Sequence, residues 1–310
     1  MIGCTWFLVD WPKVKSEWKI LSLITFCGVA SVGLSLIPVF WKSQVGLIFG
    51  TALFYLTTLA FIWAAYRVFP TTMIGKVAFY MLLMRVQRPS MEGALDYFYT
   101  STCLHGGPQL SVFYFVTVLG LVSACASVVG LALYQIFLKT WTFRSVVFVT
   151  VILNAIGSAS DLFVVTRLNV RLGVPDAVAV MLGDAVIQPI VAMLNWIPGS
   201  ILIRSGTFFF FFFLGEFPCL TDSNFSQSCP KGLESSVFAF LAGISNLSLS
   251  GSKLTGALVM QLGQIDSSER VCNYASLPLL VLVCHVISPI VIGCASAFLL
   301  PNKPQTERLE

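Results

Sequence analysis

The chain has 310 residues, of which 57% are hydrophobic and only 10% are charged, and its formal net charge is +4. Soluble domains carry about 25% charged and about 45–50% apolar residues. This composition therefore excludes a soluble enzyme, a disordered protein and a nucleic-acid-binding protein. Because about 20 apolar residues cross a bilayer as a helix, we expect an all-α, polytopic membrane protein.

Apolar segments follow one another along almost the whole chain, and each is a candidate membrane-spanning helix. They are residues 20–41, 43–66, 68–84, 108–138, 145–166, 177–203, 235–263 and 271–300. The third segment is the shortest, and its helix is expected either to end near Met84 or to continue past Pro89 towards Tyr99. The sequence thus predicts about eight transmembrane helices.

Basic residues predict the orientation of these helices. Lys and Arg are more frequent in the amino-terminal segment and in every second loop after it than in the alternate loops, to which Arg85 and Arg88 are assigned. Because basic loops stay on the cytoplasmic side, residues 1–19 and the tail 301–310 are expected to be cytoplasmic or stromal. The amino terminus has no signal-peptide pattern, and the sequence leaves the membrane open between plasma membrane and plastid envelope.

The sequence shows no pattern typical of a metal site or an enzyme. Its nine cysteines include no CxxC pair, and its two histidines, His105 and His285, lie in no recognisable nucleophile motif. A phosphate-binding loop and a dinucleotide fingerprint are also missing. We therefore expect no metal, no cofactor and no enzymatic activity.

Polar groups inside the predicted helices are the candidate site residues, because each is costly in hydrocarbon and must face protein or water. Asp161 lies in the fifth helix, and Asp184 and Gln188 are spaced to share one face of the sixth. Asn246 and Lys253 share a face of the seventh. Two polar faces in an apolar bundle indicate a lined cavity. The alternative is that the amides join neighbouring helices and that the lysine reaches the nearer surface.

Prolines within the predicted helices indicate that several of them bend. Pro189 and Pro198 lie in the sixth helix, and Pro278 and Pro289 lie in the eighth. Bent helices around a central site are typical of secondary transporters, although channels use them as well.

Short motifs occur in a characteristic order between about residues 85 and 300. They are residues 89–100, 130–139, 161–167, 172–176, 183–184 and 229–234, followed by Phe238-Ala239, Ser245-Asn246 and 256–258. The most specific is the Cys-Pro-Lys-Gly-Leu-Glu stretch at 229–234. Together they resemble motifs of the folate-biopterin transporter family, and the sequence as a whole is most similar to the plant members.

This resemblance implies the major facilitator fold, with twelve helices in two six-helix halves. It also implies a proton-coupled carrier of folates or pterins in the lipid bilayer. Residues 20–66 would then be the last two helices of the amino-terminal half, residues 67–300 the carboxy-terminal half, and the first four helices would be missing. Two alternatives stay open: a non-transporting membrane protein that binds or regulates a full-length carrier, and an unrelated channel or membrane enzyme.

The chemistry of a pterin ring suggests roles for several polar and aromatic residues. The ring offers a flat amino-amide edge to a carboxylate and its face to an aromatic side chain. Asp161 or Asp184 is therefore expected to accept the edge, and Tyr97, Phe98 and Tyr99 are expected to stack on the ring. A carboxylic acid buried in the membrane is also suited to carry the coupled proton.

The glutamate tail of a folate is anionic and would pair with a basic residue. Lys253, Arg167 and Arg204 are the candidates for this contact. The complete set of candidate substrate-binding or proton-coupling residues is Asp96, Tyr97, Tyr99, Asp161, Arg167, Asp184, Gln188, Arg204, Glu234, Asn246 and Lys253. Each of them has the alternative role of an interhelix packing contact.

Residues 206–227 depart from the family pattern. They include an uninterrupted run of phenylalanines at 208–213, and they are too short and too interrupted by Glu216, Pro218 and Asp222 to form a further span. Phenylalanine codons consist of pyrimidines, so a splice-site pyrimidine tract reads as such a run when it is translated. We therefore expect 206–227 to be a non-family insert that arises from a retained intron or a gene-model error.

Overall fold

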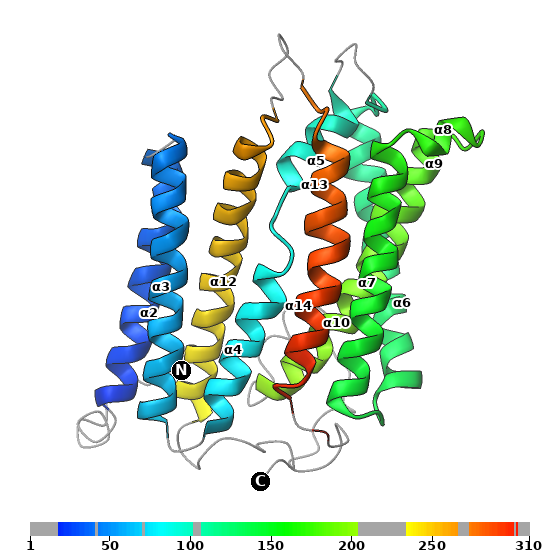
Figure 1. Cartoon of the computed structure of the whole chain (residues 1–310). Coiled ribbons are helices and arrows are strands. Elements are labelled where there is room, and N and C mark those ends of the chain that lie inside the picture. The colour runs from blue at the N-terminus through cyan, green and yellow to red at the C-terminus, as the bar shows by residue number, and fades with distance from the viewer. Residues whose placement is uncertain are drawn as a thin grey trace, which may run out of the picture.

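The described part of the chain is a bundle of long helices that run side by side (Figure 1). This computed structural model describes residues 18–40, 43–69, 72–101, 107–203, 234–265, 273–300 and 302. Six of its helices have the length and the apolar composition to cross a membrane. Large apolar side chains such as Phe26, Phe40 and Phe113 are exposed on its surface, as lipid contact requires. The expected all-α, polytopic membrane protein is confirmed.

Every segment predicted to span the membrane contains a helix. The long helices are α2 (Trp18–Phe40), α3 (Gln44–Val68), α4 (Thr72–Val86), α6 (Leu119–Leu133), α7 (Phe143–Val165), α10 (Gln188–Ile203) and α12 (Glu234–Leu262). The shorter α-helices are α5 (Glu92–Thr100), α8 (Leu168–Arg171), α9 (Asp176–Val180), α13 (Leu277–Val281) and α14 (Ser288–Ala297). Four π-helical turns extend them: η1 (Phe113–Val118), η2 (Tyr134–Leu138), η3 (Met181–Ile187) and η5 (Leu282–Ile287).

Two of the helix starts are capped by hydroxyl side chains. Ser43 Oγ accepts a hydrogen bond from the Gly46 N–H at 3.2 Å at the start of α3. Thr142 Oγ1 accepts from the Ser145 N–H at 3.3 Å at the start of α7. Such caps satisfy backbone donors that no helical carbonyl can reach, so local sequence determines where these two helices begin.

The third predicted helix is interrupted within the bundle. α4 ends at Val86, α5 begins at Glu92, and residues 87–91 join them without helical structure. In Figure 1 this connection runs along the bundle between the two helices. Pro89 explains the interruption, because proline donates no hydrogen bond and disfavours helical geometry at Arg88 before it. Of the two expected ends, continuation past Pro89 towards Tyr99 is the one that fits, because α5 carries the segment to Thr100 after the interruption. We refer to residues 87–91 as the helix break.

Two of the π-helical turns come directly before prolines. η3 ends two residues before Pro189, and η5 ends two residues before Pro289. A proline leaves a carbonyl of the preceding turn without its helical donor, and a wide π-helical turn is one way to accommodate this change. These turns carry Asp184 and His285. The bends predicted at Pro189 and Pro289 are therefore close to two polar residues in the interior of the bundle.

The helix break lies where two apolar cores meet. One core joins α2, α3, α4 and α12 and includes Phe54 and Phe240. The other joins α5, α7, η3 and α13 and includes Tyr99 and Leu277. Because α4 packs into the first core and α5 into the second, the helix break connects the two and is held on both sides.

Candidate functional site

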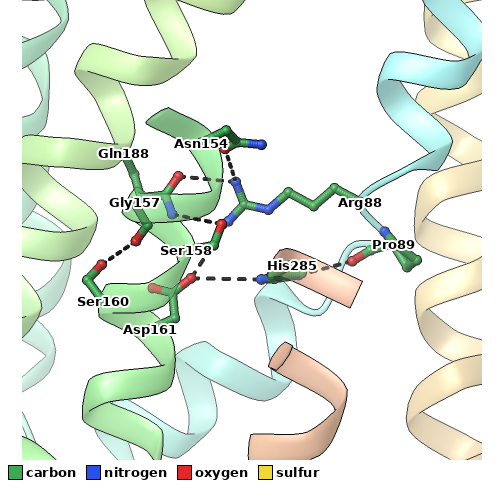
Figure 2. Close-up of polar contacts among 9 residues, drawn as sticks. All are labelled: Arg88, Pro89, Asn154, Gly157, Ser158, Ser160, Asp161, Gln188 and His285. Atoms are coloured by element: carbon green, nitrogen blue, oxygen red, sulfur yellow. Dashed lines mark hydrogen bonds and ion pairs between the residues drawn. The ribbon is translucent and has the colours of Figure 1, made fainter. Parts of the chain in front are cut away.

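Polar side chains from several helices gather at the helix break inside the apolar bundle (Figure 2). Arg88 extends from the helix break, and its Nη1 donates hydrogen bonds to Asn154 Oδ1 of α7 at 3.3 Å and to Gln188 Oε1 of α10 at 3.1 Å. Its Nη2 lies 3.7 Å from Asp161 Oδ2 of α7. We call Arg88, Asn154, Asp161, Gln188 and His285 the polar cluster.

Asp161 is the acid of the polar cluster, and it is deeply buried. Its side chain is 3% exposed, and its Oδ2 lies 3.7 Å from Arg88 Nη2 and 3.8 Å from His285 Nδ1. A charge at this depth is very costly unless it is paired. Arg88 supplies the compensating positive charge, although both separations exceed the length of a hydrogen bond.

Asp184 adds a second carboxyl group next to Asp161. It comes from η3, is half-buried, and lies within electrostatic range of Asp161. Two ionised carboxylates this close repel each other. The site therefore gathers two titratable carboxyl groups beside Arg88.

Helix α5 extends this acidic region. Asp96 and Tyr99 both lie within electrostatic range of Asp184. Tyr99 is 2% exposed, and its ring packs against Phe98 and Phe115. Its faces are therefore largely covered by protein, which makes it a wall of the site rather than an open stacking surface.

Neighbouring helices hold the backbone of the helix break. The Ser90 N–H donates to the Ser252 carbonyl of α12 at 3.1 Å, and Ser252 Oγ donates to the Arg88 carbonyl at 2.7 Å. Gly256 of α12 packs closely against the helix break. A Cβ placed on this glycine would lie only 1.9 Å from the Ser90 carbonyl oxygen. On the other side, His285 Nε2 lies 3.2 Å from the Pro89 carbonyl oxygen. The position of Arg88 thus depends on two other helices.

Arg167 forms a separate ion pair. Its guanidinium makes two parallel hydrogen bonds of 2.9 Å with the Asp176 carboxylate, and Asn169 Nδ2 donates to the same carboxylate at 2.6 Å. This pair joins the end of α7 to the start of α9. The fork of Arg167 is therefore occupied by a protein carboxylate, and it does not contact the polar cluster.

The other expected site residues lie in several places. Asn246 and Lys253 are exposed on α12, and Tyr97 is 57% exposed on α5. Glu234 is the first residue of α12, but its side chain and the whole of Arg204 lie outside the described residues. Of the expected residues, the structure brings together Asp96, Tyr99, Asp161, Asp184 and Gln188.

Sequence reasoning missed Arg88, Asn154 and His285 as site residues. Arg88 was assigned to a surface loop for the orientation, and this assignment is wrong because its guanidinium contacts α7 and α10 inside the bundle. The proline that directly follows Arg88 was the available signal. Among the described residues, no group of three or more His, Cys, Asp or Glu is placed to hold a metal ion.

Comparisons with known proteins agree with the expected resemblance. The sequence model of the BT1 family matches residues 23–205 and 223–310 and leaves 206–222 unmatched. "Probable folate-biopterin transporter 2" of Arabidopsis thaliana is 24% identical over 245 residues, which are 78% of this chain and 42% of the relative.

Similar proteins also occur in Plasmodium and in a cyanobacterium. "Folate transporter 2" of Plasmodium falciparum is 26% identical over 196 residues, 63% of this chain and 37% of the relative. "Folate-biopterin transporter" of Synechocystis sp. is 26% identical over 177 residues, 57% of this chain and 28% of the relative. The chain thus spans less than half the length of these relatives. No solved structure matches it.

Proposed function

The chain belongs to the BT1 family, and from this premise we propose that it transports folates or related pterins across a membrane in a proton-coupled manner. The names of its relatives in plants, Plasmodium and a cyanobacterium support this substrate class. The observation that carries the proposal is the polar cluster, a partly compensated arginine held at a helix break inside an apolar bundle. Discontinuous helices around a buried polar site are typical of secondary transporters.

Arg88 is the proposed receptor for the anionic tail of the substrate. Within the described part of the chain, its Nη1 contacts only the neutral amide oxygens of Asn154 and Gln188 at hydrogen-bond distance, and Asp161 lies farther away. Arginine binds a carboxylate more strongly than an amide oxygen, so a substrate carboxylate can replace these partners. The occupied fork of Arg167 favours Arg88 over it in this role.

Asp184 is the proposed acceptor for the amino-amide edge of the pterin ring. It is half-buried, whereas Asp161 is almost completely buried and close to Arg88. Asp184 is therefore the acid that a substrate reaches more easily.

Binding and uptake of labelled compounds test the proposal. The purified chain is titrated with folate and biopterin, and vesicles containing it are assayed for uptake with and without an inwardly directed proton gradient. We expect saturable binding of both compounds and uptake of folate that the gradient stimulates. Binding of neither compound would contradict the proposal. Binding without uptake, together with co-purification of a full-length relative, would instead support a regulatory membrane protein.

Replacing Asp184 by Asn is expected to abolish accumulation of substrate. Asn keeps the size of the side chain, but it accepts only one hydrogen bond from the pterin edge with its oxygen. Uptake of labelled folate driven by a proton gradient measures the effect. Unchanged accumulation in this variant would show that Asp184 is a packing residue.

Removing residues 206–227 is expected to leave binding unchanged and to increase the yield of soluble protein in detergent. Its phenylalanine run combines high hydrophobicity with no charge, which promotes aggregation. Size-exclusion chromatography of the two forms, followed by folate titration, measures both effects. Sequencing of the transcript tests the origin of the segment: abundant message containing these codons, with peptides across the run, would refute the insert hypothesis.

A further inference from the structure

The ring of His285 lies between the helix break and the carboxylate of Asp161 (Figure 2). Its side chain is 4% exposed, so the ring is buried among protein groups. His285 Nε2 lies 3.2 Å from the carbonyl oxygen of Pro89. A carbonyl oxygen only accepts hydrogen bonds, so Nε2 must carry a hydrogen and donate it.

This hydrogen bond determines the tautomer of the neutral ring. With the hydrogen on Nε2, Nδ1 presents only a lone pair. Nδ1 is buried and has no hydrogen-bond partner among the residues that the structure describes, and it lies 3.8 Å from Asp161 Oδ2. Two acceptors therefore face each other without a donor between them. One proton is enough to convert this gap into a hydrogen bond.

The same oxygen of Asp161 also faces Arg88. Its distance is 3.7 Å to Arg88 Nη2 and 3.8 Å to His285 Nδ1. A protonated ring would attract Asp161 through a charge-assisted hydrogen bond. Arg88 would then keep only its neutral amide partners, Asn154 and Gln188, and would bind another anion more strongly.

We propose that His285 takes up the coupled proton on Nδ1 and thereby releases Arg88 from Asp161, so that Arg88 binds the carboxylate of the substrate. The inference rests on the proposed transport of folates. One proton and one carboxylate enter together, so the net charge of the polar cluster does not change. Because coupling between two binding events is reciprocal, the bound carboxylate favours the proton as strongly as the proton favours the carboxylate.

The charges around His285 agree with this order of events. Burial and the charge of Arg88 oppose a positive ring, whereas Asp184 of η3, Glu92 at the start of α5 and the nearby Asp161 carboxylate favour it. A substrate carboxylate bound to Arg88 neutralises that opposing charge. The ring is therefore expected to be neutral in the empty protein and protonated when folate is bound.

The dependence of folate affinity on pH tests the inference. In the wild-type chain, affinity is expected to rise on acidification between about pH 5 and 8, by at most about tenfold per pH unit, the limit for one linked proton. His285→Gln keeps an amide N–H for the Pro89 carbonyl but has no titrating group, and its affinity is expected to change by less than about twofold over this range.

Matched controls separate this effect from others. His105→Gln changes the other histidine of the chain and is expected to keep the wild-type pH profile. Biopterin, which has no carboxylate, is expected to bind the wild-type chain without this pH dependence. A wild-type profile in His285→Gln would overturn the inference. If the wild-type chain binds neither folate nor biopterin at any pH, the proposed function fails and the inference falls with it.

Nitrogen NMR of labelled histidine tests the inference without changing His285. In His105→Gln, His285 is the single histidine of the sequence, so its ring alone gives the signal. We expect an unprotonated Nδ1 in the empty protein and a protonated Nδ1 with folate bound. An Nδ1 that stays unprotonated with folate bound would place the proton on a carboxylate and overturn the proposal.

Discussion

Replacing Arg88 by Gln is expected to lower folate affinity by about hundredfold or more and to abolish uptake. Gln retains hydrogen-bonding capacity but removes the charge that binds the substrate carboxylate and compensates Asp161. Arg88 and a bound substrate carboxylate would form a hydrogen-bonded charge pair across a binding interface, and truncating one partner of such a pair costs about 2–5 kcal/mol. A change of about 1.4 kcal/mol corresponds to tenfold in affinity. Folate titration of the purified protein, with uptake in vesicles, measures the loss.

Two further arginine variants test whether position and geometry matter. Arg85 is exposed and lies on the preceding turn of α4, so Arg85→Gln removes the same charge and is expected to bind folate normally. Arg88→Lys keeps the charge, but a single ammonium lacks the planar fork that reaches Asn154, Gln188 and Asp161 together. We expect only partial recovery. Equal losses in Arg85→Gln and Arg88→Gln would argue against a specific site.

Replacing Gly256 by Ala is expected to cause the second large loss. The added Cβ would lie 1.9 Å from the Ser90 carbonyl oxygen and 2.7 Å from its carbonyl carbon. Because both are backbone atoms, the helix break must move, and Arg88 must move with it. Overpacking of this kind costs about 1–3 kcal/mol. A melting temperature lowered by several degrees and a weaker folate affinity are the expected results.

Gly243→Ala is the matched control on the same helix. A Cβ on Gly243 would meet Cys27 Sγ at 3.4 Å, which is ordinary van der Waals contact. This variant is expected to melt and to bind folate as the wild-type chain does. If Gly256→Ala also behaves as the wild type, the helix break tolerates displacement and does not hold Arg88 in place.

The carboxylates of the site were predictable, whereas their cation was not. Asp161 and Asp184 stand out in any hydropathy profile because each interrupts an apolar run. Arg88 gives no such signal, because it lies where the expected helix ends, and only Pro89 after it suggests something other than a loop. Lys253 also interrupts an apolar run and was predicted to line the site for the same reason as the two acids, yet it is exposed on α12.

The amino-acid sequence by itself determined that this protein is an all-α, polytopic membrane protein, where its helices lie, and which family it resembles. These properties are local, because the apolar length of a segment and the short motifs need no knowledge of distant residues. Only the tertiary structure decided which polar groups meet. Arg88 contacts Asn154 across 66 residues, and His285 contacts Pro89 across 196. Such contacts depend on how the helices pack against the helix break, and no local pattern specifies that packing.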